Sequence, residues 1–213
     1  MVIAATSETG ILHDALAELG STERPISVDD GTSKTALRAK TLWPGILREL
    51  TALHPWNHAI RTRLLNEAGE TPAFAYERQF ALPEDCVRWL PPARSSREFF
   101  RGERQGNYIL TDRAAPLPCR YIALIDDVTQ WAPAFVQLFM LRLALSLCEG
   151  VTQSEGIKDS LYRRIYAPAE GALAKAKRID GLETGETRRA NVVVQSDWLQ
   201  ARNRGSYGYG PRC

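Results

Sequence analysis

Cysteine is scarce in this sequence and follows no pattern. The four cysteines lie far apart and form no CxxC pair, at Cys86, Cys119, Cys148 and Cys213. Zinc sites and disulfide frameworks need closely spaced or regularly paired thiols, so neither is indicated. We expect buried or chemically idle thiols.

Long apolar runs and an excess of one charge are also missing. The longest apolar stretch, residues 135–147, is interrupted by Gln137 and Arg142 and is shorter than the roughly 20 residues of a membrane span. Residues 1–20 lack a basic leader and a small-residue cleavage site, which argues against a targeting peptide. The formal net charge is only +2 with the signs interleaved, unlike the strongly basic footprint of a dedicated nucleic-acid binder. We therefore expect a protein of the cytosol.

The sequence contains no local motif for catalysis. It has no phosphate-binding P-loop, dinucleotide-binding glycine motif or serine nucleophile elbow. His54 and His58 have the spacing of a metal pair on a helix, but Pro55 lies between them and no third ligand is in register. Glu84 and Asp85 are adjacent, so on an extended chain they point in opposite directions and cannot flank one substrate. The sequence predicts no catalytic, cofactor-binding or metal-binding residues, although a site assembled from distant residues would leave no such motif.

Several stretches have the apolar spacing of helices. Hydrophobic residues make up 44% of the chain and charged residues 24%, as in globular proteins, so most of it should fold. Apolar residues recur every three or four positions after a serine or threonine that can cap a helix, and over 34–53 this buried stripe includes Leu37 and Leu53. Pro44 and Pro168 predict kinks. The predicted helices span residues 7–19, 33–53, 131–149 and 154–180.

Residues 55–128 have a different pattern, with short aromatic and β-branched segments separated by proline and glycine, which is typical of strands. Phe74, Tyr76 and Phe80 would share one face of a strand over 74–80. Residues 107–110 and 120–125 indicate further strands. A basic excursion between strands contains Arg94, Arg97, Arg101 and Arg104.

The pattern as a whole predicts a predominantly helical α+β fold over residues 1–181, with the β region inserted between helices, followed by an extended C-terminal tail over 182–213. The tail is rich in glycine, threonine, arginine and asparagine. Polar chain with aromatic anchors is typical of a segment that orders on a partner, with a merely disordered end as the alternative. Its candidate anchors are Trp198, Leu199, Tyr207 and Tyr209.

The order of several segments resembles the tail tubular protein A family, the head-to-tail adaptors of short-tailed bacteriophages. The resemblance begins with residues 11–20 and continues at residues 54–59 around Trp56. Its most specific part is residues 76–88, an aromatic strand that ends in Leu-Pro-x-Asp. The motif residues there and before the apolar helix are Tyr76, Phe80, Leu82, Pro83, Asp85, Trp131 and Pro133. Family members often have a glycine-rich hairpin before the final strand, whereas only Gly106 and the pair at 112–113 offer turn chemistry here.

The resemblance implies a helical bundle with a small antiparallel β-sheet inserted between the long helices. It also implies a structural role in the virion, after assembly in the host cytoplasm, and no enzyme activity. About twelve copies would form a homo-oligomeric ring beneath the portal protein, and double-stranded DNA would pass through its channel without sequence-specific contact. The tail would bind the portal protein, and the inserted sheet and its loops would bind tail nozzle or fibre proteins.

Two other classes of function stay open. A DNA-binding or packaging accessory protein would use the arginines of the basic excursion, and steep salt dependence of duplex binding would favour it. An enzyme with a dispersed site would show a higher melting temperature with a metal or nucleotide.

Overall fold

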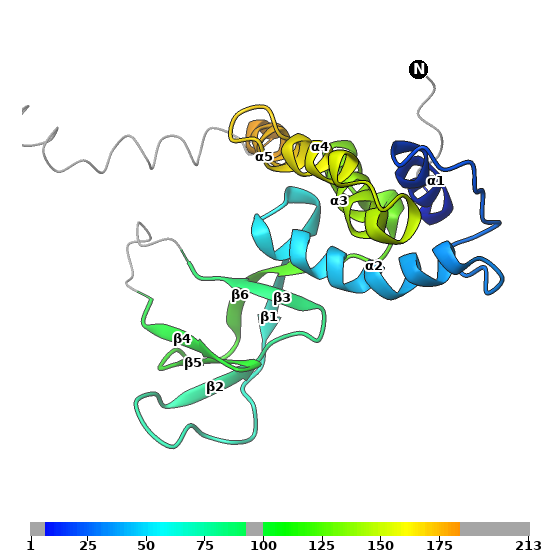
Figure 1. The fold of residues 1–213 in the computed structure, drawn as a ribbon. Helices are drawn as coiled ribbons and strands as arrows, with labels where there is room; N and C mark the ends of the chain where they lie inside the picture. The colour runs from blue at the N-terminus through cyan, green and yellow to red at the C-terminus, as the bar shows by residue number, and fades with distance from the viewer. Residues whose placement is uncertain (1–6, 93–99, 184–213) are drawn as a thin grey trace, which may run out of the picture.

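A computed structural model describes residues 7–92 and 100–183 of the chain. Over these residues the fold is α+β, as expected, with five α-helices and two small antiparallel sheets (Figure 1). The α-helices are α1 Glu8–Glu18, α2 Lys34–Leu53, α3 Pro133–Val151, α4 Glu155–Tyr166 and α5 Ala172–Glu183, and short 3-10 turns are η1 Asn57–Ala59 and η2 Val128–Gln130. The strands are β1 Ile60–Leu65, β2 Arg78–Ala81, β3 Cys86–Leu90, β4 Gly102–Gln105, β5 Tyr108–Thr111 and β6 Leu117–Ala123.

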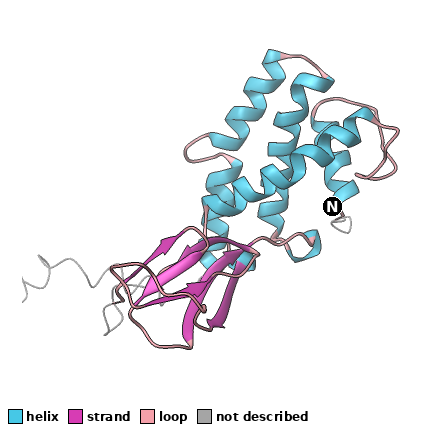
Figure 2. Ribbon diagram, turned by 90° about the horizontal axis from the view of Figure 1, so that it is seen from below, coloured by secondary structure: helices cyan, strands magenta, loops and turns pink. Residues whose placement is uncertain are grey.

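The apolar helix α3 is the centre of the bundle. It packs against α1, α2, α4 and α5 (Figure 2). By length and composition alone α3 could cross a membrane. The neighbouring helices account for its apolar surface, because they bury side chains on several of its sides. The buried side chains of α3 are Phe135, Leu138, Phe139, Leu141, Leu143, Ala144, Leu147 and Cys148.

Local sequence signals determine most helix ends. The side chains of Ser7, Ser33 and Ser154 accept hydrogen bonds from backbone N–H groups of the first turns of α1, α2 and α4. Gly20, with a positive φ of 71°, follows the end of α1. The expected start of the central helix at 131 was two residues early, since Pro133 occupies the first turn of α3.

The expected helix over 154–180 is broken rather than kinked. Two helices, α4 and α5, lie on either side of Pro168. Proline has no N–H to donate and its ring clashes with the preceding turn, so helical bonding stops there. The backbone N–H groups of Gly171 and Lys175 then bond to the carbonyls of Ala167 and Gly171, which starts α5.

Gly171 at this break is expected to tolerate no side chain. A β-carbon there would lie 2.6 Å from the carbonyl oxygens of Ile165 and Ala167. Gly171→Ala should therefore lower the free energy of unfolding by about 2 kcal/mol, measured by urea denaturation. Gly45→Ala in α2 is the matched control, because nothing lies within 4 Å of its β-carbon position. That variant should be more stable by about 0.5 kcal/mol, and equal effects at the two glycines would contradict the close contact.

The strands form two sheets that share one core. Sheet A has the order β1-β6-β3 and sheet B has the order β2-β5-β4, all antiparallel. The side chains between them come from both sheets and from the turn after β2. They are Leu65, Phe80, Leu82, Cys86, Ile109, Leu117, Cys119, Tyr121 and Ala123.

Several expectations about the β region need correction. The strand expected over 74–80 is shorter, because β2 begins at Arg78; Phe74 lies in the preceding loop with 81% of its surface exposed. The hairpin lacking a glycine-rich signal is present, with Gly106 and Asn107 joining β4 to β5. Gly106 has the positive φ, 58°, that a type II′ turn requires at its first position. Arg104, expected in a loop, lies within β4.

Two expected members of the α2 stripe are also not buried. Leu37 and Leu53 are each more than two-fifths exposed, while Ala36, Trp43 and Leu50 face the core. Leu37 lies in the first turn of α2 and Leu53 is its last residue.

Helical bundle and sheets meet at the C-terminal end of α2. Ile122 of β6 belongs to the core of the helices, and α2 contacts β3 and β6. The Arg88 guanidinium of β3 donates a hydrogen bond to the carbonyl oxygen of Ala52, at 2.9 Å. The sheet part is therefore attached to the bundle at one junction and extends away from it (Figure 1).

Candidate functional site

An aspartate of α5, distant in sequence, contacts the corner between α2 and β1. Asp180, in the last turn of α5, is 4% exposed. Its carboxylate accepts a hydrogen bond from the backbone N–H of Asn57 at 2.8 Å, and its carbonyl oxygen accepts one from the Asn57 side-chain amide at 2.7 Å. His54 Nε2 lies 3.1 Å from the same carboxylate. We call Asp180, His54 and Asn57 the corner clasp, since they join α5 to the entry of the sheet part.

The clasp histidine is neutral near pH 7. Burial lowers the pKa of His54, although the Asp180 carboxylate opposes this shift. Because a carboxylate only accepts hydrogen bonds, Nε2 of the neutral ring carries the proton that faces Asp180. The contact is therefore a hydrogen bond between a neutral ring and a carboxylate rather than an ion pair.

His58, in the same corner, makes the fold sensitive to acid. Its Nδ1 is buried with no hydrogen-bond partner in the described part of the chain, and burial lowers the pKa of His58 from 6.5 to about 4. The unfolded chain therefore takes up a proton between pH 6.5 and 4 that the folded chain excludes. Unfolding free energy should fall by about 1.5 kcal/mol between pH 7 and pH 5.

His58→Phe tests this directly, because a phenyl ring can keep the contacts with Trp56 and Phe135 but cannot titrate. Denaturation curves at the two pH values should differ less for the variant than for the parent protein. Carboxylates such as Glu18 and Asp127 have a lowered pKa in the folded chain, so they change protonation mainly below pH 5 and add little to the difference between pH 7 and pH 5. An unchanged pH dependence would contradict the assignment to His58.

The tryptophans of the family motifs lie in one aromatic cluster behind the clasp. The Trp56 indole donates to the carbonyl oxygen of Leu50, and the Trp131 indole donates to that of Ile125, both at 2.8 Å. Phe135 of α3 lies between them, with ring centroids 5.2 Å from Trp56 and 5.3 Å from Trp131. The predicted residues therefore fix the start of α3 against the end of α2.

The Leu-Pro-Glu-Asp turn joins the two sheets. Phe80 is fully buried, and the Leu82 N–H donates to the carbonyl oxygen of Asn107 before Pro83 ends the strand pairing. Asp85, a short acidic residue just after Pro83, would be able to bond to the backbone of its own turn. The contact found for its side chain crosses the sheet, since the Tyr121 hydroxyl donates to the Asp85 carboxylate at 3.3 Å.

The remaining motif residue, Tyr76, stands beside the sheets rather than within a strand. The Arg101 guanidinium lies over its ring, 5.4 Å from the centroid. Arg101 also pairs with Asp112 at 3.5 Å, and Arg104 donates to the carbonyl oxygens of Val87 and Gly106. These two arginines of the basic excursion therefore have intramolecular partners.

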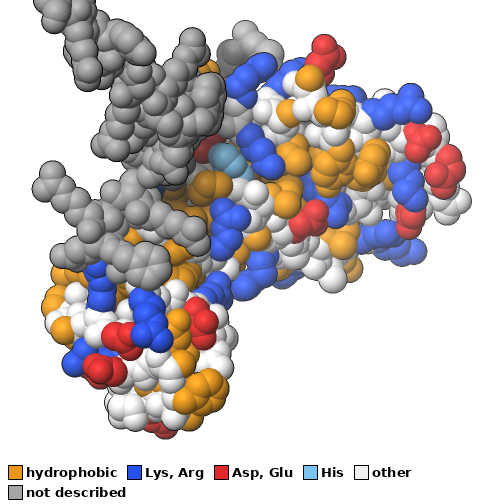
Figure 3. Space-filling model, turned by 90° about the vertical axis from the view of Figure 1, so that its left-hand side faces the viewer, with side chains coloured by type: hydrophobic (Ala, Val, Ile, Leu, Met, Phe, Trp, Pro, Cys, Tyr) orange, Lys and Arg blue, Asp and Glu red, His pale blue; other side chains and the backbone are white. Residues whose placement is uncertain are grey.

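Charge is mixed over the visible surface of the helical part. Figure 3 shows Lys and Arg side chains interspersed with Asp and Glu and with hydrophobic patches. Arg94 and Arg97 lie outside the described residues. So do the four candidate anchors of the tail, Trp198, Leu199, Tyr207 and Tyr209, whose predicted role is untested.

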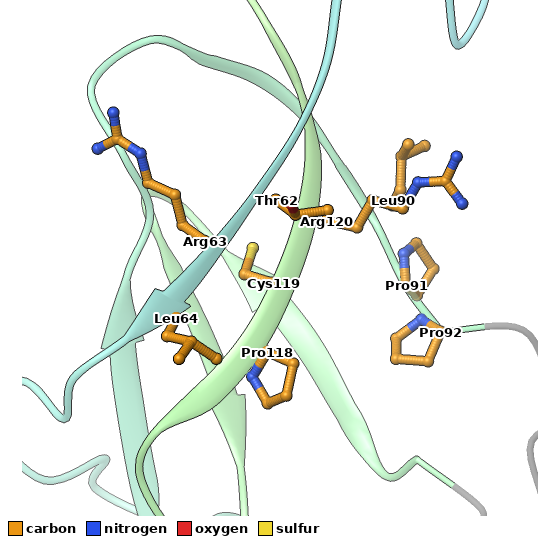
Figure 4. A pocket seen from close by; sticks show the side chains of 9 residues that line it. All are labelled: Thr62, Arg63, Leu64, Leu90, Pro91, Pro92, Pro118, Cys119 and Arg120. Atoms are coloured by element: carbon orange, nitrogen blue, oxygen red, sulfur yellow. The ribbon is translucent and has the colours of Figure 1, made fainter. Parts of the chain in front are cut away.

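A hollow of about 590 Å³ lies on the outer face of sheet A (Figure 4). The strand register places Thr62 and Leu64 of β1 beside Arg120 and Pro118 of β6, and Leu90 of β3 on the other side of Arg120. Leu64 is 67% exposed. We call this feature the sheet A hollow; its lining is Thr62, Arg63, Leu64, Leu90, Pro91, Pro92, Pro118, Cys119 and Arg120.

The hollow has the composition of a binding surface for a protein segment rather than of a catalytic pocket. Its walls are mostly aliphatic and proline side chains, its charged lining residues are Arg63 and Arg120, and no carboxylate or histidine of the described residues lines it. Neither Arg63 nor Arg120 forms an ion pair with any described residue. Sequence reasoning missed it, because the hollow depends on the pairing of three strands whose register the sequence does not show.

Reactive chemistry has little support in residues 7–92 and 100–183. No group of three or more His, Cys, Asp or Glu side chains in these residues could hold a metal ion. Cys86, Cys119 and Cys148 are buried and unpaired. Burial raises the pKa of Cys86, and it raises the pKa of Cys119 to about 11, so neither thiol is a nucleophile near neutral pH.

Comparison with known proteins gives no family assignment. No protein-family model matches the chain, and no curated protein matches it. The resemblance to the tail tubular protein A family therefore rests on the segments described above and stays a prediction.

Proposed function

We propose that this chain is a structural virion protein, a head-to-tail adaptor. Its copies form a ring beneath the portal protein, connect it to the tail nozzle or fibre proteins, and enclose a channel for the passage of double-stranded DNA. The observation that carries the proposal is the location of the resembling segments. The segments around Trp56, Asp85 and Trp131 come from distant parts of the sequence and lie near the junction between the bundle and the sheets, whereas residues 11–20 lie mostly in α1, which packs on α3.

At this junction the motif residues have structural roles that suit an assembly protein. Trp56 and Trp131 pack against Phe135, and Asp85 bonds to Tyr121 across the sheet. The motif thus specifies the angle at which the sheet part leaves the bundle. A ring subunit needs such a fixed angle, because each copy must present different surfaces to its two neighbours at a constant rotation.

The end of α5 supports a second element of the proposal. Asp180 of the corner clasp lies three residues before Glu183, after which the chain continues with residues 184–213. The clasp therefore fixes the point from which the C-terminal segment leaves the body. We infer that this segment binds the portal protein, and that the sheet part binds the nozzle or fibre proteins.

The charge distribution suits a channel wall better than a tight DNA-binding surface. The net charge is only +2, and Arg101 and Arg104 have intramolecular partners. Neutralising many phosphates would hold DNA in place, whereas a channel must let it slide. Retention of duplex DNA by the isolated chain, falling steeply with salt, would instead favour the DNA-binding alternative.

The assembly experiment is size-exclusion chromatography with light scattering, with and without the portal protein of the same virus. The chain alone should elute largely as a monomer, and the mixture should contain a complex of the portal with many copies of the chain. A mixture that elutes as two unchanged components would contradict the proposal.

A further inference from the structure

The loop between β1 and β2 presents an exposed aromatic side chain in a fixed position. Phe74 is 81% exposed, and Ala75 after it has a φ of 72°, which is rare for a residue with a β-carbon. The loop is held near both ends. The Ala68 N–H donates to the carbonyl oxygen of Gln79 at 2.9 Å, and the Glu77 N–H donates to the Asp112 carboxylate at 3.1 Å.

A large side chain held outward in this way has the properties of an interface anchor. An exposed phenylalanine gains nothing for the folded monomer, whereas aromatic anchors in apolar pockets dominate many protein interfaces. The Arg101 guanidinium lies over Tyr76 and near the carbonyl oxygen of Ala75, which restricts the loop further. Little conformational entropy would therefore be lost when Phe74 is bound.

The sheet A hollow has complementary shape and charge. It is large enough for an aromatic ring, has proline and leucine walls, and carries the positive charge of Arg120, whereas the Arg63 side chain points away from the other lining residues (Figure 4). Residues 66–78 contain three glutamates and one arginine, so the loop that carries Phe74 is acidic. Glu70 is exposed, and Glu67 and Glu77 share Arg78. A guanidinium can also stack on the face of an inserted ring.

We propose that Phe74 of one copy of this chain inserts into the sheet A hollow of the next copy. The proposal rests on the ring assembly proposed above and identifies its contact between neighbouring subunits. Phe74 does not line the hollow of its own chain, and among the described residues both its side chain and that of Leu64 in the hollow are largely exposed. Because the Phe74 loop and the sheet A hollow are different surfaces of one subunit, the contact is heterologous and can repeat around a ring. Both lie on the sheet part, so neighbouring sheet parts would pack directly against each other.

Thiol crosslinking tests the contact. The background variant is Cys213→Ser, in which the remaining native thiols are the buried Cys86, Cys119 and Cys148. Phe74→Cys and Leu64→Cys are then introduced together. A short bismaleimide added to the assembly with portal protein should yield covalent multimers of increasing size on a denaturing gel. The control is Phe74→Cys with Ile26→Cys, because Ile26 is 90% exposed but lies on the α1–α2 connection, away from the sheets. The control pair and the single variants should stay monomeric.

A substitution without crosslinker completes the test. Phe74→Asp should raise the concentration needed for half-maximal assembly on the portal by at least ~30-fold, as expected for an anchor residue, while Ile26→Asp should leave it unchanged. If the double-cysteine variant assembles at raised concentration but its two thiols are not linked between chains, or if Phe74→Asp assembles normally, the contact is wrong and the adaptor function stands. Linkage within one chain, with no gain in mass, also refutes the contact. If the parent protein never assembles with portal, both proposals fail.

Discussion

Removal of residues 184–213 should abolish binding to the portal protein and leave the folded body intact. The proposal gives these residues the portal contact, and all the described helices and strands end at or before Glu183. A single anchor should show much of the effect, because a few buried aromatics carry most of the energy of an interface. Trp198→Ala is therefore expected to weaken portal binding by at least ~30-fold, measured by titration calorimetry or surface plasmon resonance.

Tyr162→Ala is the matched control for the tail variants. Tyr162 is an exposed aromatic of α4, on the body of the protein. Its removal should change portal affinity less than about threefold, because exposed side chains outside an interface contribute little. Undiminished portal binding by the chain that lacks residues 184–213 would contradict the assignment of the tail.

Asp180→Ala should be among the most destabilising single substitutions in the described part of the chain. It would leave the Asn57 N–H and His54 Nε2 without their acceptor in a part-buried corner. Loss of such an acceptor costs the desolvation of each donor, so the free energy of unfolding should fall by about 3 kcal/mol. Chemical denaturation followed by tryptophan fluorescence would measure this, since Trp56 lies 4.8 Å from the His54 ring.

Asp180→Asn separates the hydrogen bonds from the charge. The amide oxygen can still accept from Asn57, and its NH2 group can donate to His54 once the neutral ring carries its proton on Nδ1. We expect this variant to lose less than half as much stability as Asp180→Ala. Equal losses would mean that the negative charge, and not the hydrogen bonding, holds the corner.

The sequence predicted helices best where a short segment contains its own signals. The bounds of α1 and α2 agreed to within a residue because the caps, Ser7 and Ser33, act on the first turns of their own helices. At Pro168 a kink was expected, but the helix is broken there. A proline can either bend a helix or end it, and the sequence alone does not show which will happen. Leu37 and Leu53 fit the helical spacing, but spacing within one helix does not show which positions its neighbours will cover.

The sheets were harder to predict because strand pairing depends on distant residues. Nothing local to 74–80 shows that Phe74 precedes the first residue paired with β5, and the sequence did not show that six strands divide into two sheets. A shared strand face was expected for Phe74, Tyr76 and Phe80, and of these three only Phe80 is buried. The corner clasp was not expected, because Asp180 and Asn57 are more than 120 residues apart along the chain.

The sheet A hollow was missed for a similar reason. Its lining comes mainly from three strands whose register the sequence does not give. The exposed Phe74 had been assigned to a buried strand face. Together these errors concealed the two surfaces that we now propose to join neighbouring subunits.

Electron microscopy of the neck of the intact virus particle tests the central claim most directly. The account predicts a ring directly beneath the portal in which each subunit has the helical bundle and the two small sheets joined at the Trp56 corner, with residues after Glu183 in contact with the portal. A particle whose neck lacks this polypeptide would contradict it.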